Sequence, residues 1–360
     1  MTSQPVVEAA KIAPSQSTAV KPTFSIGITA FNRRTMLWEC LSSILSQSEA
    51  DFEVIVGNDY VPEPLSLESL GINDARVTVV NYTKNLGEVG NLAALLEMAK
   101  GRYFTWLADD DGYLPGFLDS IHAALRSFPG VNCIFTSYAT GTDFPGEAVA
   151  SPPPPMTLLD GRDFLRRYLS RDLKVVGCFG VFETDCLRKL GGMEQLGTGF
   201  SPYSDNLLAI KCGGLERIAY VDAPLVFFRT HNASLSWTST DSGAYFSAQR
   251  DLCERSLTVF RTQQPSEGLA RNLYLLLRWC SEDYFTVMRR SRRLKAIELL
   301  KYLVFVASYA GPLGRYRHTM AATALSRAAR VSARLLRSRV KRALLRPFRP
   351  HMPDSLGEAA

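Results

Sequence analysis

Short apolar runs and amphipathic segments alternate between residues 22 and 140. Apolar runs of this length are typical of buried strands, whereas apolar residues three and four positions apart are typical of helices that cover a sheet. The alternation predicts βαβ units, and therefore an α/β fold with a mainly parallel, Rossmann-like sheet flanked by helices. The expected strands are 24–30, 52–57, 76–80, 103–107 and 131–136, and the expected helices are 35–47, 87–99 and 114–127.

Polar side chains follow three of these strands at the point where each strand ends. They are Asn32–Arg34, Asn58–Asp59 and Asp109–Asp111. Ligands of open α/β sheets bind beyond the carboxyl ends of the strands. The pattern therefore predicts that one edge of the sheet carries the functional site.

The pattern changes at the proline run Ser151–Pro155, a stiff connector that separates two halves of one domain. Beyond it we expect a helix over 158–169, a strand over 175–182, a glycine-rich loop, a helix opening near Ser204, two short strands over 218–221 and 225–228, and helices from 242 to 345. The expected organisation is a disordered leader (1–21), an α/β domain (22–240, with halves 22–140 and 156–240), a helical region (241–350) and a flexible tail (351–360).

The net charge of +6 conceals an uneven distribution. Residues 286–350 contain 17 basic side chains and one acidic side chain, whereas residues 1–285 contain 24 basic and 32 acidic ones. The basic side chains of 327–342 lie on a helical pattern that also has an apolar stripe. A basic amphipathic helix suits the surface of an anionic membrane. Packing on protein, within the chain or in an oligomer, is the first alternative, and nucleic-acid binding is a weaker one because no nucleic-acid-binding module accompanies the helix.

Three further features favour a cytoplasmic protein held at the inner face of a membrane. No stretch reaches the ~18 apolar residues needed to span a bilayer, and no secretory signal is recognisable. The seven cysteines are odd in number and scattered, which predicts reduced thiols rather than a disulfide framework.

The acidic triplet Asp109–Asp111 stands at the end of an apolar strand. Adjacent carboxylates repel one another unless a cation offsets their charge, and oxygen ligands of this kind suit Mg²⁺ or Mn²⁺. A solvated acidic turn, or a cap for the helix that follows, explains the triplet equally well.

Five segments standing in order resemble family 2 glycosyltransferases with the GT-A fold. They are Phe24–Arg33, Phe52–Tyr60, Asn85–Asn91, Gly101–Pro115 and Val221–Ser236. The resemblance implies a nucleotide-diphosphate sugar as donor, Mg²⁺ or Mn²⁺ as cofactor, and inversion of the anomeric centre.

The resemblance also implies roles for individual residues of the donor site. Thr29, Ala30 and Phe31 match the loop that frames the nucleotide, and Asp59 matches the acid that contacts the base. Arg33 is a candidate contact for the diphosphate, and Asn85 and Asn91 lie in a matched donor-site segment. Asp109 and Asp110 match the pair that touches the ribose and the metal.

Metal and base are assigned in the same way. Asp110 is the expected principal metal ligand, with Asp111 as its helper and His231 as a further ligand. Asp205 matches the general base. Ala108 and Ser204 stand where many members have acids, which is a departure from the family pattern.

The predicted function is transfer of a hexosyl or deoxyhexosyl group to a hydroxyl of a glycan or lipid-linked acceptor, in bacterial cell-surface polysaccharide synthesis. Two alternatives remain: a degenerate fold that acts as a membrane-bound scaffold, and a nucleotidyltransferase. Against the latter, the loop Phe31–Arg34 lacks the glycines of a phosphate-binding loop.

Overall fold

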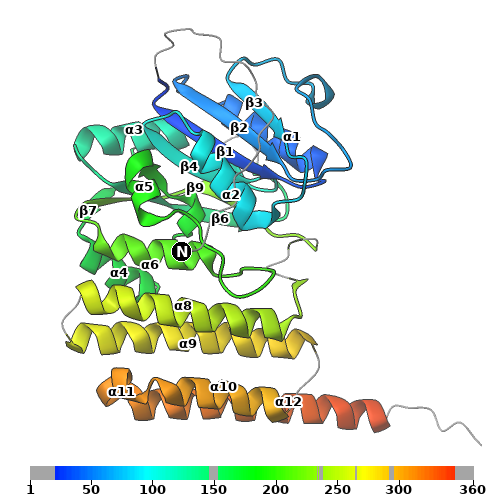
Figure 1. Ribbon diagram of the computed structural model, residues 1–360, viewed down its shortest axis with the longest axis vertical. Coiled ribbons are helices and arrows are strands. Elements are labelled where there is room, and N and C mark those ends of the chain that lie inside the picture. Colours follow the sequence, from blue (N-terminus) through cyan, green and yellow to red (C-terminus); the bar gives the residue numbers. More distant parts are fainter. Residues whose placement is uncertain are drawn as a thin grey trace, which may run out of the picture.

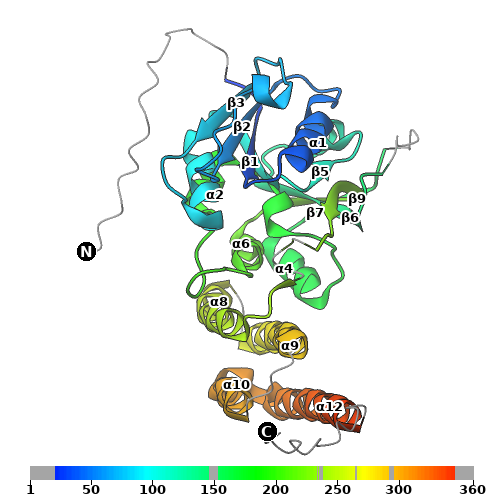
Figure 2. The ribbon, with the colours of Figure 1, turned by 90° about the vertical axis from the view of Figure 1, so that its right-hand side faces the viewer.

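An α/β domain forms one end of the molecule and layers of helices form the other (Figures 1 and 2). The computed structural model describes residues 21–145, 153–232, 234, 238–263, 266–291 and 296–344. Residues 1–20 of the expected leader, Ser151 and Pro152 of the connector, and the expected tail lie outside the described residues.

The first half of the sheet is parallel, as the sequence predicts. Strands β1 (Phe24–Ala30), β2 (Phe52–Asn58), β3 (Val77–Asn81) and β4 (Tyr103–Ala108) lie in the order β3-β2-β1-β4. Their connections include α1 (Arg34–Leu45), η1 (Glu68–Leu70) and α2 (Gly87–Met98). The carboxyl ends of β1, β2 and β4 therefore meet at one edge.

The second half of the sheet is mixed. The short strand β8 (Val181–Glu183) runs antiparallel to both β4 and β6 (Cys133–Gly141), while β9 (Ile218–Arg229) runs parallel to β6. Strands β5 (Gly112–Tyr113) and β7 (Met156–Leu159) pair antiparallel with β9. The α/β fold class is confirmed, but parallel pairing dominates only from β3 to β4.

Three segments differ from the expected elements. The run 175–182 forms the 3₁₀ turn η2 (Gly177–Phe179) and then β8, because a short apolar run does not distinguish a strand from a buried turn. Helix α4 (Gly161–Ser170) begins later than expected, where Asp160 caps it by accepting from Asp163 N at 2.8 Å. The two strands expected near 218–228 are the single strand β9, whose register against β6 shifts near Thr136–Tyr138.

The sheet separates two apolar cores. On one face, Ile26 and Ile28 pack with residues of α1 and of α3 (Phe117–Ser127). On the other face, Phe104 and Trp106 belong to a second core together with residues of α2 and α4. This second core continues through α5 (Thr184–Leu190), α6 (Ser204–Lys211) and η3 (Cys212–Gly214) into the C-terminal helices, which joins the α/β domain to the helical region.

The C-terminal region is helical, as expected. The pair α8 (Ser242–Gln263) and α9 (Ser266–Ser291) lies next to the α/β domain, and α10 (Ala296–Ser308) and α12 (Arg317–Leu344) form the outermost layer (Figure 2). The short turns α11 (Ala310–Leu313) and η4 (Gly314–Tyr316) connect α10 to α12. Tyr302 of α10 stacks on Tyr284 of α9, with ring centroids 4.4 Å apart.

Two sequence expectations can be compared with this fold. All seven cysteines are free thiols. Among the described helices, none combines the length and apolar content that crossing a bilayer requires.

Candidate functional site

The acidic triplet after β4 is buried. Asp109 is 0 % exposed, Asp110 8 % and Asp111 3 %. The residue that precedes α3 is Gly116, and no side chain caps this helix. The triplet is therefore neither a solvated turn nor a helix cap, and the charge of its carboxylates must be compensated by groups of the site itself.

Arg33 supplies much of this compensation from the loop after β1. Its guanidinium lies 2.5 Å from Asp109 Oδ1 and 2.7 Å from Asp110 Oδ2. The backbone N–H of Phe31 donates to Asp109 Oδ2 at 2.9 Å. Burial nevertheless raises the pKa of Asp109 to about 6, because the positive charge of Arg33 offsets only part of the desolvation. Ion pairs thus connect the loop after β1 to the acidic turn after β4.

Asp111 faces in a different direction from Asp110. Its Oδ1 accepts from Arg229 N at 2.9 Å, and burial raises its pKa well above the usual range. The Arg229 guanidinium donates to the Asp110 carbonyl at 2.8 Å and pairs with Glu39 of α1. These contacts anchor the acidic turn on β9 and orient Asp110.

Asp110 and His231 lie side by side, although 121 positions separate them in the sequence. His231 Nε2 is 2.8 Å from Asp110 Oδ2, and the two side chains are 13 % and 11 % exposed. A carboxylate beside an imidazole fits Mg²⁺ or Mn²⁺ chemically. No group of three or more His, Cys, Asp or Glu side chains with metal-binding geometry occurs in the described part of the chain. A cation here would need oxygen atoms of the substrate or water as its remaining ligands.

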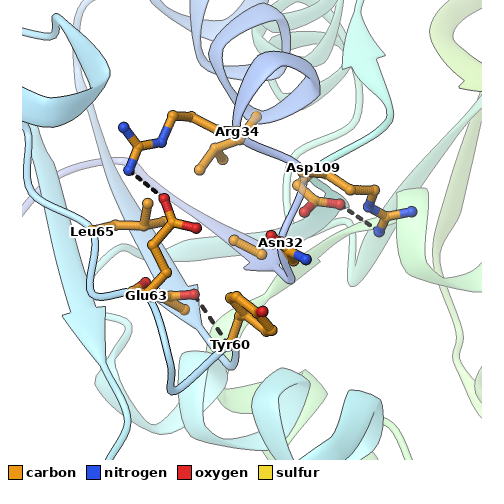
Figure 3. Close-up of a pocket in the computed structure, with 10 residues that line it drawn as sticks. Asn32, Arg34, Tyr60, Glu63, Leu65 and Asp109 are labelled. Atoms are coloured by element: carbon orange, nitrogen blue, oxygen red, sulfur yellow. Dashed lines mark hydrogen bonds and ion pairs between the residues drawn. The ribbon is translucent and has the colours of Figure 1, made fainter.

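The expected nucleotide loop forms a small pocket at the end of β1 (Figure 3). Thr29 and Ala30 end the strand, and Phe31 is 47 % exposed and meets Tyr60 edge-on at 5.3 Å. The cavity volume is about 20 Å³, room for roughly one water molecule. Figure 3 shows an ion pair between Arg34 and Glu63 beside it. A nucleotide could enter this pocket only if the side chains of Arg33 and Arg34, which line it, moved aside.

Three other expected donor-site residues lie around the start of α2: Asp59 and Asn91 join α2 to the end of β2, and Asn85 closes a local turn. Asp59 accepts from Leu86 N at 2.6 Å, and Asn85 accepts from Gly87 N at 2.8 Å. The buried Asn91 donates to Gly57 O at 2.8 Å and accepts from the Tyr82 hydroxyl at 3.1 Å. These side chains form the frame of the site, and their contact with a donor stays a prediction.

Asp205, the expected base, stands in the first turn of α6. Burial raises its pKa to about 6. The α6 backbone packs closely on η2: a Cβ atom at Gly177 would lie 2.0 Å from Asp205 O.

Glu88 is a residue that the sequence reasoning did not select. It keeps access to solvent at the start of α2, yet desolvation and the charges of Asp205 and Asp110 raise its pKa to about 7. Carboxylates from β4, α2 and α6 are therefore close enough to interact. The only signal in the sequence is the position of Glu88 inside the segment Asn85–Asn91, where an acid in the first turn of a helix needs no functional explanation.

Comparisons with known proteins bear on the fold and on the family of one segment of the chain. Residues 25–182 match the family model described as glycosyl transferase family 2. A Campylobacter jejuni protein named GalNAc(5)-diNAcBac-PP-undecaprenol beta-1,3-glucosyltransferase is 31% identical over 103 residues, 28% of this chain and 33% of the relative. A putative colanic acid biosynthesis glycosyl transferase of Escherichia coli is 28% identical over 99 residues, 27% of this chain and 36% of the relative. The chain thus spans about a third of the length of the curated relatives it matches.

Among solved structures, S. aureus TarS 1–349 in complex with UDP-GlcNAc superposes with a TM-score of 0.60 at 13% identity. The superposition covers 89% of this chain and 92% of TarS 1–349. The likeness establishes the fold, and the GT-A class expected from the sequence is confirmed. Residues 25–182, which include the acidic turn, therefore resemble glycosyl transferase family 2.

Proposed function

We propose that this protein is an inverting glycosyltransferase that moves a hexosyl or deoxyhexosyl group from a nucleotide-diphosphate sugar to an acceptor hydroxyl. The observation that carries the proposal is the 2.8 Å contact between His231 and Asp110. A second pair, Glu88 and Asp205, supports it: burial raises the pKa of both carboxyl groups, and the charge of Asp205 raises the pKa of Glu88 further. Asp110 and His231 are suited to the diphosphate end of a donor, whereas Glu88 and Asp205 are suited to proton transfer at an acceptor.

In this proposal a single displacement forms one bond and breaks another. The acceptor oxygen bonds to the anomeric carbon as the bond from that carbon to the diphosphate oxygen breaks. The acceptor proton passes to Asp205, or to Glu88 as the alternative base. Mg²⁺ or Mn²⁺, bound by Asp110 and His231, would stabilise the negative charge of the departing nucleoside diphosphate. Asp111 and Arg229 hold the backbone that positions Asp110.

The donor side of the site uses the groups at the ends of β1 and β2. The exposed ring of Phe31 and the half-buried ring of Tyr60 form an aromatic pair for the nucleotide base. Arg33 turns from Asp109 and Asp110 toward the diphosphate, since a guanidinium pairs with phosphate oxygens as well as with carboxylates. Asp59, Asn85 and Asn91 stabilise the start of α2 on the same side of the site.

For the acceptor we propose a glycan or lipid-linked saccharide of bacterial cell-surface polysaccharide synthesis. The names of the Campylobacter and Escherichia relatives support this class. We further propose that the enzyme works at the inner face of the membrane through its basic C-terminal helices. The net charge of +16 over residues 286–350 and the exposed apolar side chains Ile297, Leu300 and Val304 of α10 support that location.

A donor screen tests the proposal against its rivals. The purified full-length chain is incubated with UDP-, GDP-, dTDP- and CDP-sugars, Mn²⁺ and a membrane extract as acceptor source, and release of nucleoside diphosphate is measured. Release that requires Mn²⁺ and is lost in Asp110→Asn is the expected result. No release from any donor supports the scaffold alternative. Release of inorganic pyrophosphate from a nucleoside triphosphate and a sugar phosphate supports a nucleotidyltransferase.

A further inference from the structure

A groove lined by four arginines lies between α9 and α12, in the helical region and away from the acidic turn. Its cavity volume is about 260 Å³. Guanidinium groups from both helices line it, together with the ring of Phe285 at one side. The arginines are Arg289 of α9 and Arg327, Arg330 and Arg334 of α12.

The groove carries an excess of positive charge. Glu282 is the one acidic residue among the described residues that line it. Its two carboxylate oxygens already pair with Arg171 at 2.9 Å and with Arg327 at 3.3 Å. Arg289 donates to the neutral Thr286 hydroxyl at 2.8 Å, and Arg330 and Arg334 are exposed. Like charges gathered in this way favour an anion as a partner.

The packing of the two helices holds these arginines in place. Arg327 donates to Arg278 O at 2.8 Å and is 14 % exposed, which fixes the groove-facing side of α12. Val331 of α12 is buried against the same seam. At the other end of the helix pair, Tyr316 stacks on Tyr274 with centroids 5.2 Å apart. The two helices therefore run side by side in the same direction, and their register determines which arginines face each other.

We infer that this groove is a binding site for a phosphate-bearing anion. The planar guanidinium pairs with two phosphate oxygens at once, and several such groups converging on one cavity match a phosphate or diphosphate better than a single-point anion. The same chemistry is offered by a soluble diphosphate and by the headgroup of an anionic phospholipid. The inference does not depend on the proposed transfer reaction, because none of these arginines belongs to the site at the end of β4.

Two pairs of substitutions test the inference with equal loss of charge. The groove variant is Arg289→Gln with Arg330→Gln, one arginine from each helix; Arg327 is left intact because it anchors α12. The control variant is Arg271→Gln with Arg317→Gln, which are exposed residues at the opposite end of the same two helices. Circular dichroism and thermal melts verify that each variant is folded.

The full-length protein is titrated calorimetrically with inorganic pyrophosphate, and it is sedimented with phosphatidylcholine vesicles that contain or lack phosphatidylglycerol. We expect the wild type to bind at least one of these anionic probes, the groove variant to bind it at least about tenfold more weakly, and the control to stay within about twofold. Loss in the pyrophosphate arm identifies a soluble phosphate, and loss in the vesicle arm alone identifies a lipid headgroup. The inference is overturned if the wild type binds neither probe, or if both variants lose binding equally.

Discussion

His231 Nε2 lies 2.8 Å from Asp110 Oδ2, which joins the segment after β9 to the segment after β4. The pairing of Gly112 with Phe227 and the hydrogen bond from Arg229 N to Asp111 bring these segments together. The contact is therefore fixed by the antiparallel register of the short strand β5 against β9, and it places an imidazole beside the carboxylate expected to bind a metal.

The first prediction concerns this pair. Asp110→Asn and His231→Ala should each weaken Mn²⁺ binding in the presence of UDP by about 10–100-fold, because the first removes the negative charge of a ligand and the second removes the imidazole. Electron paramagnetic resonance of free Mn²⁺ measures the affinity. Asp185→Asn, which changes an exposed carboxylate on α5, is the control and should have no effect. Unchanged Mn²⁺ affinity in Asp110→Asn would remove Asp110 from the metal site.

The second prediction separates the two candidate bases. Asp205→Asn should lower kcat by about 10²–10⁴-fold and leave the donor KM within a few-fold, since a general base acts only in the chemical step. Glu88→Gln should cost no more than about tenfold if its role is electrostatic. Both variants are assayed with the donor identified by the screen. The reverse pattern would assign the base to Glu88.

The third prediction is a pH profile. Burial raises the pKa of Asp205 to about 6, and the base must be unprotonated to accept a proton. Transfer should therefore fall tenfold per pH unit below about 6 and remain level above it until other groups titrate. In Glu88→Gln this acidic limb should persist. A limb near the usual pKa of an aspartate, about 4, would contradict the assignment. The titratable groups that couple to Asp205 from neighbouring elements are Glu88, Asp283, Tyr138, Tyr168 and Cys178.

The fourth prediction concerns the support of α6. Gly177→Ala places a methyl group 2.0 Å from the carbonyl oxygen of Asp205, and a backbone atom cannot move aside cheaply. We expect a loss of about 1–3 kcal/mol in the free energy of unfolding, and a kcat reduced further than stability alone explains, because Asp205 is displaced. Thermal melts and initial rates measure the two effects. Gly311→Ala, with nothing within 4 Å of its added methyl, should be nearly neutral. A Gly177→Ala enzyme with wild-type kcat would show that Asp205 tolerates displacement.

Local pattern accounts for the elements that were predicted well. The strands β1, β2 and β4 follow continuous apolar runs, and α2 follows apolar residues at helical spacing. The segment 175–182 was misassigned because η2 and β8 are both apolar and buried. The packing of Gly177 against α6 distinguishes the 3₁₀ turn from a strand in this segment. The residues that make this contact lie far apart in the sequence, so local pattern does not reveal it.

The sequence by itself determined the α/β class, the edge of the sheet at which the acidic triplet lies, and the helical C-terminal region. Each of these follows from periodicity or from neighbouring residues. Only the tertiary structure decided that Asp111 faces Arg229 while Asp110 faces His231, that Glu88 lies near Asp205, and that arginines of α9 and α12 face one groove. These relationships depend on strand register and helix packing between residues far apart in the chain, and burial then sets the charge of the groups that meet.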